Sequence, residues 1–256
     1  MTSCELKIDL NCDMGEMREA IDDGTQEALM RSITSANVAC GGHAGDSTMM
    51  RATIEQAQRA GVAIGAHPGY ADRKNFGRLE LQIETLKVAE SVFEQVKALA
   101  EIAKNCKARV VHVKPHGALY NQAVRNRDLA NAIADGVARW NLDVALVGLA
   151  GSPMLDFFRE AGFRVAAEAF ADRRYEPDGT LRSRKFADAL IRDPEAAARQ
   201  ALDIVKKGIV TASDGSEVAV AAQTICIHGD TPGATAIAAA VSRTLREAGV
   251  TLIGLV

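Results

Sequence analysis

Short apolar runs alternate with amphipathic helical runs along almost the whole chain. We expect helices over residues 25–33, 47–61, 86–103, 128–139, 194–207 and 234–247, and one that begins near residue 153. The apolar runs predict strands near residues 6–10, 36–39, 62–65, 109–113, 144–147, 164–167, 218–227 and 251–255. A strand, a helix and another strand in regular succession are typical of a parallel sheet. The pattern therefore predicts an α/β protein with seven or eight mostly parallel strands.

The clearest helical pattern lies in the middle of the chain. Apolar residues recur there at spacings of three and four, at Leu86, Ala89, Phe93, Val96, Ala100 and Ala103. This spacing predicts one buried stripe along a long helix. An earlier helix has clear boundaries, because Asp46 is a good N-terminal cap and Gly61 a typical C-terminal residue.

Polar and ionisable residues follow the apolar runs at nearly every predicted strand end. These clusters begin at Asp9, Cys40, Ala66, Lys114, Glu168 and His228. In an open doubly wound sheet, ligands gather at one switch point, whereas a closed barrel collects residues from many strand ends on one rim. The six ends favour a (β/α) barrel, possibly distorted, over an open sheet.

Length and composition are compatible with a barrel enzyme. The 256 residues contain no Pro/Gly/Ser-rich linker, so we expect a single barrel-like hydrolase domain over residues 1–256. A net charge of −3 and 4% aromatic residues argue against a nucleic-acid partner. The chain has neither a basic segment followed by an apolar run at its start nor 18 consecutive apolar residues, so we expect a cytoplasmic protein without a membrane partner. Five scattered cysteines are expected to be reduced.

Two clusters near the start of the chain carry candidate catalytic groups. Asp9, Asn11 and Asp13 alternate, so an extended backbone places all three on one side. Together with Glu16 they could bind a metal or provide a general base, although Asp and Asn also cap loops. His43 follows Gly42, whose missing side chain allows a ligand to approach the backbone.

Further candidates follow the later strands. His67 lies between glycines, and Lys114 and His116 flank a proline. A lysine that ends a core strand requires an anionic partner or substrate. Arginine side chains after the sixth predicted strand are suited to carboxylate or phosphate recognition. The remaining candidates are Glu168, Asp172, Arg173, His228 and Asp230.

Several familiar catalytic motifs are absent from the sequence. There is no G-x-x-x-x-G-K-[ST] loop, no G-x-G-x-x-G after the first strand, no G-x-S-x-G and no H-E-x-x-H. Covalent serine chemistry and an independent phosphate loop are therefore not expected. Acid–base or metal-assisted hydrolysis remains.

The motifs resemble those of the LamB/YcsF family from Leu6 to the C-terminus. The matching segments are DLNCDMGE at 9–16, NVACGGHAGD at 37–46, AHPGY at 66–70, NFGR at 75–78, VKPHGALYN at 113–121, EAFADR at 168–173 and IHGD at 227–230. The resemblance implies a barrel related to sugar deacetylases and the A component of a bacterial 5-oxoprolinase. It also implies cleavage of 5-oxo-L-proline to L-glutamate, ATP as a co-substrate, and partner subunits B and C.

Within that resemblance we expect Asp13, His43 and His67 to form the hydrolytic centre. If a divalent metal is bound, the same three residues would hold it. Related deacetylases use an aspartate and two histidines, but their paired histidine motif is not reproduced, because His43 is followed by Ala44-Gly45-Asp46.

The other candidates divide into charge stabilisation, proton transfer and substrate binding. We expect Lys114 and His116 to stabilise developing negative charge. Orientation or proton transfer is expected from Glu168, Asp172, His228 and Asp230. Substrate contacts are expected from Asp9, Asn11, Gly42 and Arg173, the last of which would pair with the substrate carboxylate.

Two other functions are compatible with the same residues. A free-standing metal-dependent deacetylase or amidohydrolase would use the histidine–aspartate rim, although sugar grooves usually contain more aromatic residues. A non-catalytic binding protein would only present 5-oxoproline to its partners, which the density of ionisable residues disfavours. Activity without ATP would indicate the first, and activity that survives several rim substitutions would indicate the second.

Overall fold

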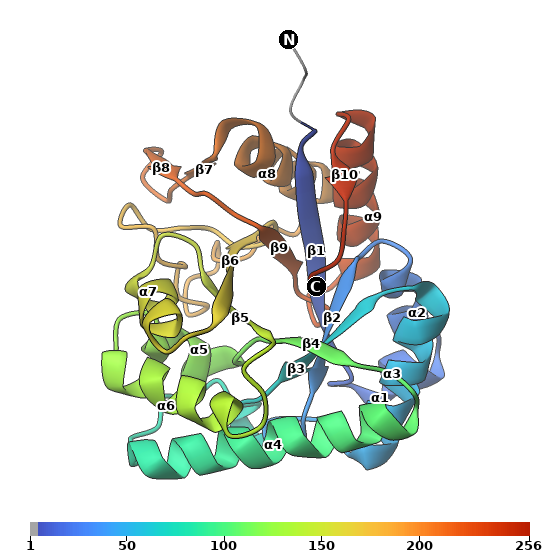
Figure 1. Ribbon diagram of the computed structural model, residues 1–256. Coiled ribbons are helices and arrows are strands. Elements are labelled where there is room, and N and C mark those ends of the chain that lie inside the picture. Colours follow the sequence, from blue (N-terminus) through green and yellow to red (C-terminus); the bar gives the residue numbers. More distant parts are fainter. Residues whose placement is uncertain (1–4) are drawn as a thin grey trace.

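Seven parallel strands close into a barrel in the computed structural model, which describes residues 5–256 (Figure 1). The barrel strands are β1 (Lys7–Met14), β2 (Ser35–Ala39), β3 (Ala63–His67), β4 (Val110–Val113), β5 (Ala145–Leu149), β6 (Arg164–Phe170) and β9 (Thr224–Ile227). Strand β1 pairs with β2 on one side and with β9 on the other, which completes the ring. The predicted barrel is therefore confirmed. An additional short strand, β10 (Thr251–Leu252), pairs with the start of β1.

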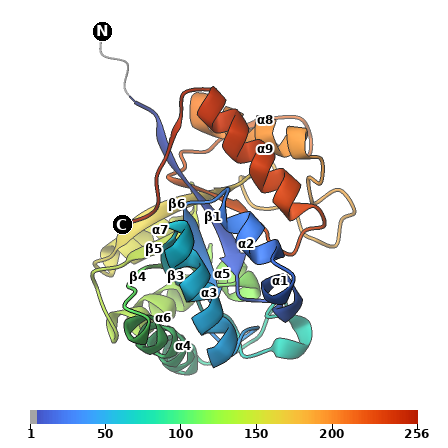
Figure 2. The same cartoon turned by 90° about the vertical axis from the view of Figure 1, so that its right-hand side faces the viewer.

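The helices surround the barrel and cover its strands. They are α1 (Arg18–Asp22), α2 (Thr25–Met30), α3 (Ser47–Ala60), α4 (Thr85–Asn105), α5 (Gly117–Ala123), α6 (Arg127–Ala138), α7 (Pro153–Glu160), α8 (Pro194–Lys207) and α9 (Ala234–Glu247). Helices α8 and α9 lie side by side at one end of the molecule (Figure 2). Apolar side chains fill the layer between strands and helices, as expected where both faces of a parallel sheet are covered.

Helix boundaries follow the expected capping chemistry. The Asp46 carboxylate accepts hydrogen bonds from the backbone N–H groups of Thr48 and Met49 at the start of α3. Gly61 ends that helix with a left-handed φ of 68°. Both predictions for α3 are confirmed.

The buried stripe of α4 differs from the one expected. Leu86 is 84% exposed, whereas Val88, Val92 and Leu99 are buried. Helix α4 begins at Thr85, so Leu86 lies in its first turn, ahead of the part of the helix that packs on the barrel and α6. The predicted helix is confirmed, and so is the burial of Ala89, Val96 and Ala103, but the buried face also includes Val88, Val92 and Leu99 and leaves Leu86 exposed.

The segment between β6 and β9 is more complex than the single strand expected over residues 218–227. Strands β7 (Ile209–Thr211) and β8 (Glu217–Ala219) form a separate antiparallel pair, and only β9 belongs to the barrel.

A short 3₁₀ helix, η1 (Arg73–Asn75), lies in the loop between β3 and α4. Helices α1 and α5 were also not expected from the pattern.

Strand β1 is longer than predicted and continues through the polar cluster that was expected to follow it. Asp9, Asn11 and Asp13 point into the barrel interior at successive levels, where they form hydrogen bonds with other inward-facing groups. At the lowest level, the Asp9 carboxylate accepts bonds from Ser35 and Thr224. The interior of this barrel is polar, so a strand whose inward-facing residues are polar, such as β1, can form part of it.

The structure also bears on the expectations that the cysteines are reduced and that no segment spans a membrane. Cys12, Cys40, Cys106 and Cys226 are free thiols, as expected, whereas Cys4 lies outside the described residues. None of the helices within residues 5–256 is long and apolar enough to cross a membrane.

Candidate active site

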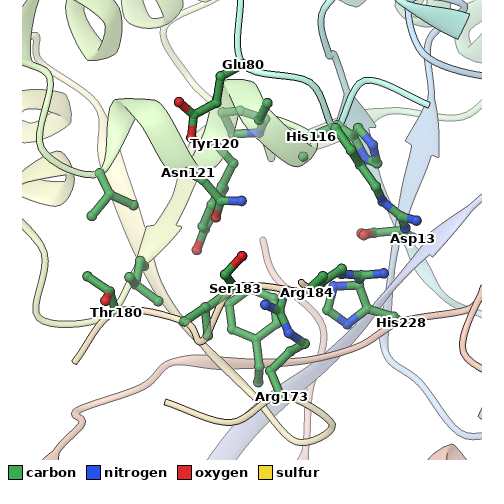
Figure 3. A pocket seen from close by; sticks show the side chains of 18 of the residues that line it. Asp13, Glu80, His116, Tyr120, Asn121, Arg173, Thr180, Ser183, Arg184 and His228 are labelled. Carbon is green, nitrogen blue, oxygen red and sulfur yellow. The ribbon is translucent and has the colours of Figure 1, made fainter. Parts of the chain in front are cut away.

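A cavity of about 750 Å³ opens at the carboxyl ends of the barrel strands. Figure 3 shows Asp13, His116 and His228 together on one side of it and Tyr120 with Asn121 on the opposite side. The loops after β3, β4, β6 and β9 contribute its wall. The strand ends therefore meet at one rim, as expected for this fold.

Lys114, directly after β4, occupies the centre of the cavity floor. Its ammonium group lies 3.0 Å from an Asp13 oxygen and 2.8 Å from a Glu168 oxygen. Two further contacts, at 3.2 Å to the Asn11 side-chain oxygen and 3.1 Å to the Cys226 sulfur, complete its surroundings. This buried lysine thus has the anionic partners that its position requires.

The pairing of opposite charges determines the protonation states of Lys114 and Asp13 on the cavity floor. Burial alone would lower the pKa of Lys114, but Asp13, Cys226 and Glu168 together raise it well above its ordinary value. Burial would raise the pKa of Asp13, but His67 and Lys114 hold it well below its ordinary value. The ion pair is therefore charged at neutral pH.

Three histidines and a glutamate form a second cluster beside Asp13, which we call the histidine cluster: Glu16, His43, His67 and His116. His67 Nε2 lies 2.9 Å from His116 Nδ1 and 3.3 Å from Asp13 Oδ2. Glu16 Oε1 lies 2.9 Å from His43 Nε2 and 3.4 Å from His116 Nδ1. The rings of His43 and His116 stack with centroids 3.5 Å apart.

Burial dominates the titration of the histidine cluster. It lowers the pKa of His43 to about 2, with a smaller contribution from the charge of His67. Burial, followed by the neighbouring histidines, also lowers the pKa of His116 well below its ordinary value. Burial and the negative charge of Asp13 raise the pKa of Glu16 to about 7. Neutral imidazoles are the forms that can act as bases or ligands.

His228 and Asp172 form a hydrogen-bonded pair on the same side of the cavity. The Asp172 oxygens lie 2.9 and 3.1 Å from His228 Nδ1, and one of them accepts the His228 backbone N–H at 3.0 Å. Burial would raise the pKa of Asp172, but His228 lowers it below its ordinary value. An ionised carboxylate on Nδ1 leaves Nε2 available for proton transfer toward the cavity.

Two polar side chains of the cavity wall have buried atoms without protein partners. These are the Nε of Arg173 and the hydroxyl of Tyr120. Arg173 lines the cavity and donates one hydrogen bond to the Arg182 carbonyl. Burial, assisted by the charge of Arg184, lowers the pKa of Arg173 to about 10, so it remains a cation at neutral pH. Unpaired buried donors in a cavity are typical of a substrate contact.

Asp230 contacts two arginines that line the cavity. Its carboxylate accepts a hydrogen bond from Arg78 and lies 3.5 Å from Arg184, and both arginines line the cavity. Burial would raise the pKa of Asp230, but Arg78 and His228 lower it. The pair links the loop after β3 to the loop after β9.

The structure divides the residues predicted from the sequence into three groups. Those that line the cavity are Asp13, His67, Lys114, His116, Arg173 and His228. Those that contact the lining residues from behind are His43, Glu168, Asp172, Asp230 and Asn11. Asp9 lies deeper in the barrel, with hydroxyl partners around its carboxylate. Gly42 packs against Gln95, since a side-chain carbon there would approach Gln95 Oε1 to 2.3 Å.

Glu16 and Arg184 also belong to the site, as members of clusters considered for metal, base or anion binding. Tyr120 and Arg78 belong to it as well, although they were visible only as members of motifs. Their proximity depends on loops that are far apart in sequence, as the Arg78–Asp230 contact across 152 positions illustrates.

Among residues 5–256, two groups of side chains have the donors and the spacing for a metal ion. One is the histidine cluster, and the other consists of Asp13, Cys226 and His228. Asp13, His43 and His67, the set expected from the resemblance, are thus divided between the two groups. Lys114 lies 3.1 Å from Cys226, which places a competing cation inside the second group.

Known proteins share this architecture and much of this sequence. Residues 8–255 match the LamB/YcsF family. The chain is 51% identical over 247 residues to a protein from Chloroflexus aggregans named as the A component of 5-oxoprolinase, covering 96% of this chain and 98% of that protein. The crystal structure of a lactam utilization protein from Thermus thermophilus has a TM-score of 0.90 at 42% identity, covering 97% of this chain and 100% of that one.

More distant structures share the fold alone. A family 4 carbohydrate esterase from Streptomyces lividans, crystallised with acetate, has a TM-score of 0.53 at 12% identity, covering 98% of this chain and 93% of that chain. Such low identity carries no functional inference. The match over residues 8–255 is decisive for the family: this chain belongs to the LamB/YcsF family.

Proposed function

We propose that this chain is the A component of an ATP-dependent 5-oxoprolinase, a hydrolase that opens the lactam of 5-oxo-L-proline to give L-glutamate. The observation that carries this proposal is the near-full-length identity to proteins named as that component of 5-oxoprolinase. Their names imply an enzyme of several different chains, and we propose subunits B and C as the partners. Residues 1–256 would act as one barrel domain, and the free thiols fit a reducing cytoplasm.

Arg173 and Tyr120 are suited to hold the substrate carboxylate. Both line the cavity, and each has a buried donor without a protein partner. A guanidinium matches the geometry of a carboxylate and forms charge-assisted hydrogen bonds with it. Arg184, which also lines the cavity, adds positive charge. A carboxylate fixed there would leave the lactam ring to extend toward the floor around Asp13 and Lys114.

The floor provides the groups for adding water to the lactam carbonyl carbon. Lys114 would stabilise the negative charge that develops on the carbonyl oxygen, and His116, which lines the cavity beside it, would act through the group that its Nδ1 holds. Asp13 would accept the proton of the attacking water, which His67 would help to hold, since His67 Nε2 and Asp13 Oδ2 lie 3.3 Å apart and both residues line the cavity. His43 would support this centre from behind, through Glu16.

Ring opening also requires a proton on the departing nitrogen. The hydroxyl group of the water joins the carbonyl carbon, the C–N bond breaks, and the ring nitrogen takes up a proton to become the amine of glutamate. His228 is the best candidate donor, because Asp172 fixes its Nδ1 and it lines the same side of the cavity as Asp13 (Figure 3). Glu168 and Asp230 would orient Lys114 and Arg78.

ATP is proposed as a co-substrate of the assembled enzyme. A five-membered lactam is a weak electrophile and re-forms readily, so transfer of the γ-phosphoryl group of ATP to the carbonyl oxygen, with release of ADP, would drive the reaction forward. Water addition and C–N cleavage would then leave an acyl phosphate, which a second water would hydrolyse to the glutamate carboxylate and phosphate. The cavity is larger than one 5-oxoproline molecule requires, and Arg78, Arg184 and Lys185 give its rim the positive charge that phosphate oxygens favour. The sequence has no phosphate-binding loop of its own, which agrees with activation shared with partner subunits.

The test is glutamate release from 5-oxo-L-proline by this chain with candidate subunits B and C, omitting each protein and ATP in turn. We expect release only when all components are present. Amide hydrolysis by the chain alone without ATP would instead indicate an independent amidohydrolase. No glutamate under any combination would refute the assigned substrate.

A further inference from the structure

The hydrogen bonds of His67 and His116 determine which of their ring nitrogens carry protons. His67 Nδ1 lies 2.7 Å from the Lys114 carbonyl oxygen, and His116 Nε2 lies 2.9 Å from the Phe76 carbonyl oxygen. A carbonyl oxygen only accepts, so both of these nitrogens must be N–H donors. In a neutral imidazole the other nitrogen then carries a lone pair.

The two lone pairs face each other. His67 Nε2 and His116 Nδ1 are 2.9 Å apart, and both residues are at most 4% exposed. Two acceptors at this distance repel unless a cation lies between or beside them. Glu16 Oε1, 3.4 Å from His116 Nδ1, and Asp13 Oδ2, 3.3 Å from His67 Nε2, add negative charge to the same place. The geometry therefore requires a positive species.

We propose that His67 Nε2, His116 Nδ1 and Glu16 Oε1 bind one divalent transition-metal ion of the zinc class. Two imidazoles and a carboxylate are a donor set suited to Zn²⁺. Ligands on a tetrahedral ion with bonds of about 2.0–2.1 Å are separated by about 3.3 Å, close to the observed separations of 2.9 and 3.4 Å.

The surroundings of these three ligands have the features of a metal site. Each histidine donates its second N–H to a backbone carbonyl, which fixes the tautomer and the ring orientation. His67 and His116 line the cavity, so an ion can enter and a coordination position faces the space assigned to substrate. A proton shared between the two histidines would satisfy their lone pairs but would leave Glu16 without a partner on its His116 side.

His43 orients the carboxylate and is not a ligand in this arrangement. Its ring is parallel to that of His116 at 3.5 Å, so the in-plane lone pairs of the two rings cannot converge on one ion. Its Nε2 lies 2.9 Å from Glu16 Oε1, where an N–H would donate to the carboxylate. Glu16 and His116 thus replace Asp13 and His43 in the ligand set expected from the resemblance.

Calorimetric titration of chelator-treated protein with Zn²⁺ tests the site without reference to substrate or activity. We expect saturable binding of one ion, and a Co²⁺-loaded sample should show the visible absorption of a four- or five-coordinate ion. Glu16→Gln and His116→Asn should each weaken binding by more than about 100-fold. His43→Gln should weaken it by about 10–100-fold, as for residues that orient ligands.

The matched control is His228→Gln, a histidine of the same cavity in the other candidate ligand group. Its Zn²⁺ affinity should equal that of the unmodified chain. Circular dichroism would verify that each variant is folded. Absence of saturable binding by the unmodified chain would overturn the proposal. So would unchanged affinity in folded Glu16→Gln and His116→Asn, or loss of binding in His228→Gln instead.

Discussion

Lys114 connects the interior of the barrel to its catalytic floor. Its ammonium group contacts groups from β1, β6 and β9, so a single side chain bridges three strands. Removing one partner of a buried ion pair is costly, because the remaining charge stays out of water without compensation. At this residue, the requirements of folding and of charge stabilisation coincide.

Replacing Lys114 by methionine should therefore destabilise the protein strongly. The variant leaves the carboxylates of Asp13 and Glu168 buried without their cation, at a cost of about 3–5 kcal/mol in the free energy of unfolding. Denaturant unfolding monitored by circular dichroism measures this cost. The double variant Lys114→Met/Glu168→Gln should recover part of the loss. A single variant within about 1 kcal/mol of the unmodified chain would contradict this expectation.

Glu16 should give the protein a distinctive pH dependence of stability when metal is removed by a chelator. Its pKa is raised to about 7 in the folded chain by burial and Asp13, from 4.5 when exposed. The folded state then binds its proton more tightly than the unfolded state does. The resulting stabilisation is complete below pH 4.5 and is lost as the pH rises through about 7.

Comparison with Glu16→Gln isolates this contribution. From about pH 5 to about pH 8, the unmodified chain should lose up to about 3 kcal/mol of unfolding free energy relative to the variant. Denaturant unfolding at several pH values, with chelator throughout, measures the difference. Parallel stability profiles for the two proteins would show that Glu16 is not the titrating group.

At the residue scale, the sequence predicted six of the residues that line the cavity but not how their hydrogen bonds divide roles among them. Motifs at strand ends identified Asp13, His67 and Lys114 because such ends meet at one rim. The ligand role proposed for His116 could not be predicted, since its tautomer depends on the Phe76 carbonyl, 40 positions away. Nothing in the sequence indicated that Asp9 lies below the cavity.

At the scale of elements, the close approach of β3 and β4 depends on a glycine. A side-chain carbon at Gly65 would lie 2.0 Å from Nε2 of His112, whose buried ring fills the adjacent space in the barrel. The same Nε2 lies 2.8 Å from the Asn37 side-chain oxygen, so the ring cannot move without losing a partner. Gly65 is therefore needed because its lack of a side chain lets the His112 ring of β4 pack directly against the backbone of β3.

Gly65→Ala should destabilise the barrel by about 3 kcal/mol or somewhat more, because the added methyl group overlaps a fixed ring. Removing the ring should relieve the overlap, so the variant Gly65→Ala/His112→Ala should be more stable than the sum of the single changes predicts. A double-mutant cycle by thermal unfolding measures this coupling. Strict additivity of the two changes would contradict the proposed packing.

Helix and strand periods predicted most elements, and the failures have physical causes. The helix over α4 was recognised from its apolar spacing, but packing against the barrel and α6 selects a face that excludes Leu86. Strand β1 was predicted too short because apolarity is the usual sign of a core strand. Its inward residues instead form a hydrogen-bonded polar interior with Asn37 and Thr224.

At the scale of the whole molecule, closure of the barrel was predictable because six strand ends carried polar clusters. Polar clusters at six strand ends fit the continuous rim of a barrel better than the single switch point of an open sheet. The hairpin of β7 and β8 was not predictable in this way, since it lies outside the barrel and its strands are only three residues long.

At the same scale, the cavity places Tyr120, proposed for substrate binding, away from the groups proposed for chemistry. Asp13, His116 and His228 lie on one side of the cavity, whereas Tyr120 is on the opposite side (Figure 3). A substrate whose carboxylate is held near Tyr120 and Arg173 would present its ring to the histidines. This arrangement favours ring opening in this chain, whichever protein of the complex handles ATP.

The most direct test of that claim is glutamate release by the assembled enzyme carrying His228→Gln in this chain. Removing a positioned general acid should reduce turnover by about 100-fold or more. The variant should still co-purify with subunits B and C, which shows that assembly is intact. Full-rate glutamate release from such a complex would contradict the assignment of ring opening to this chain.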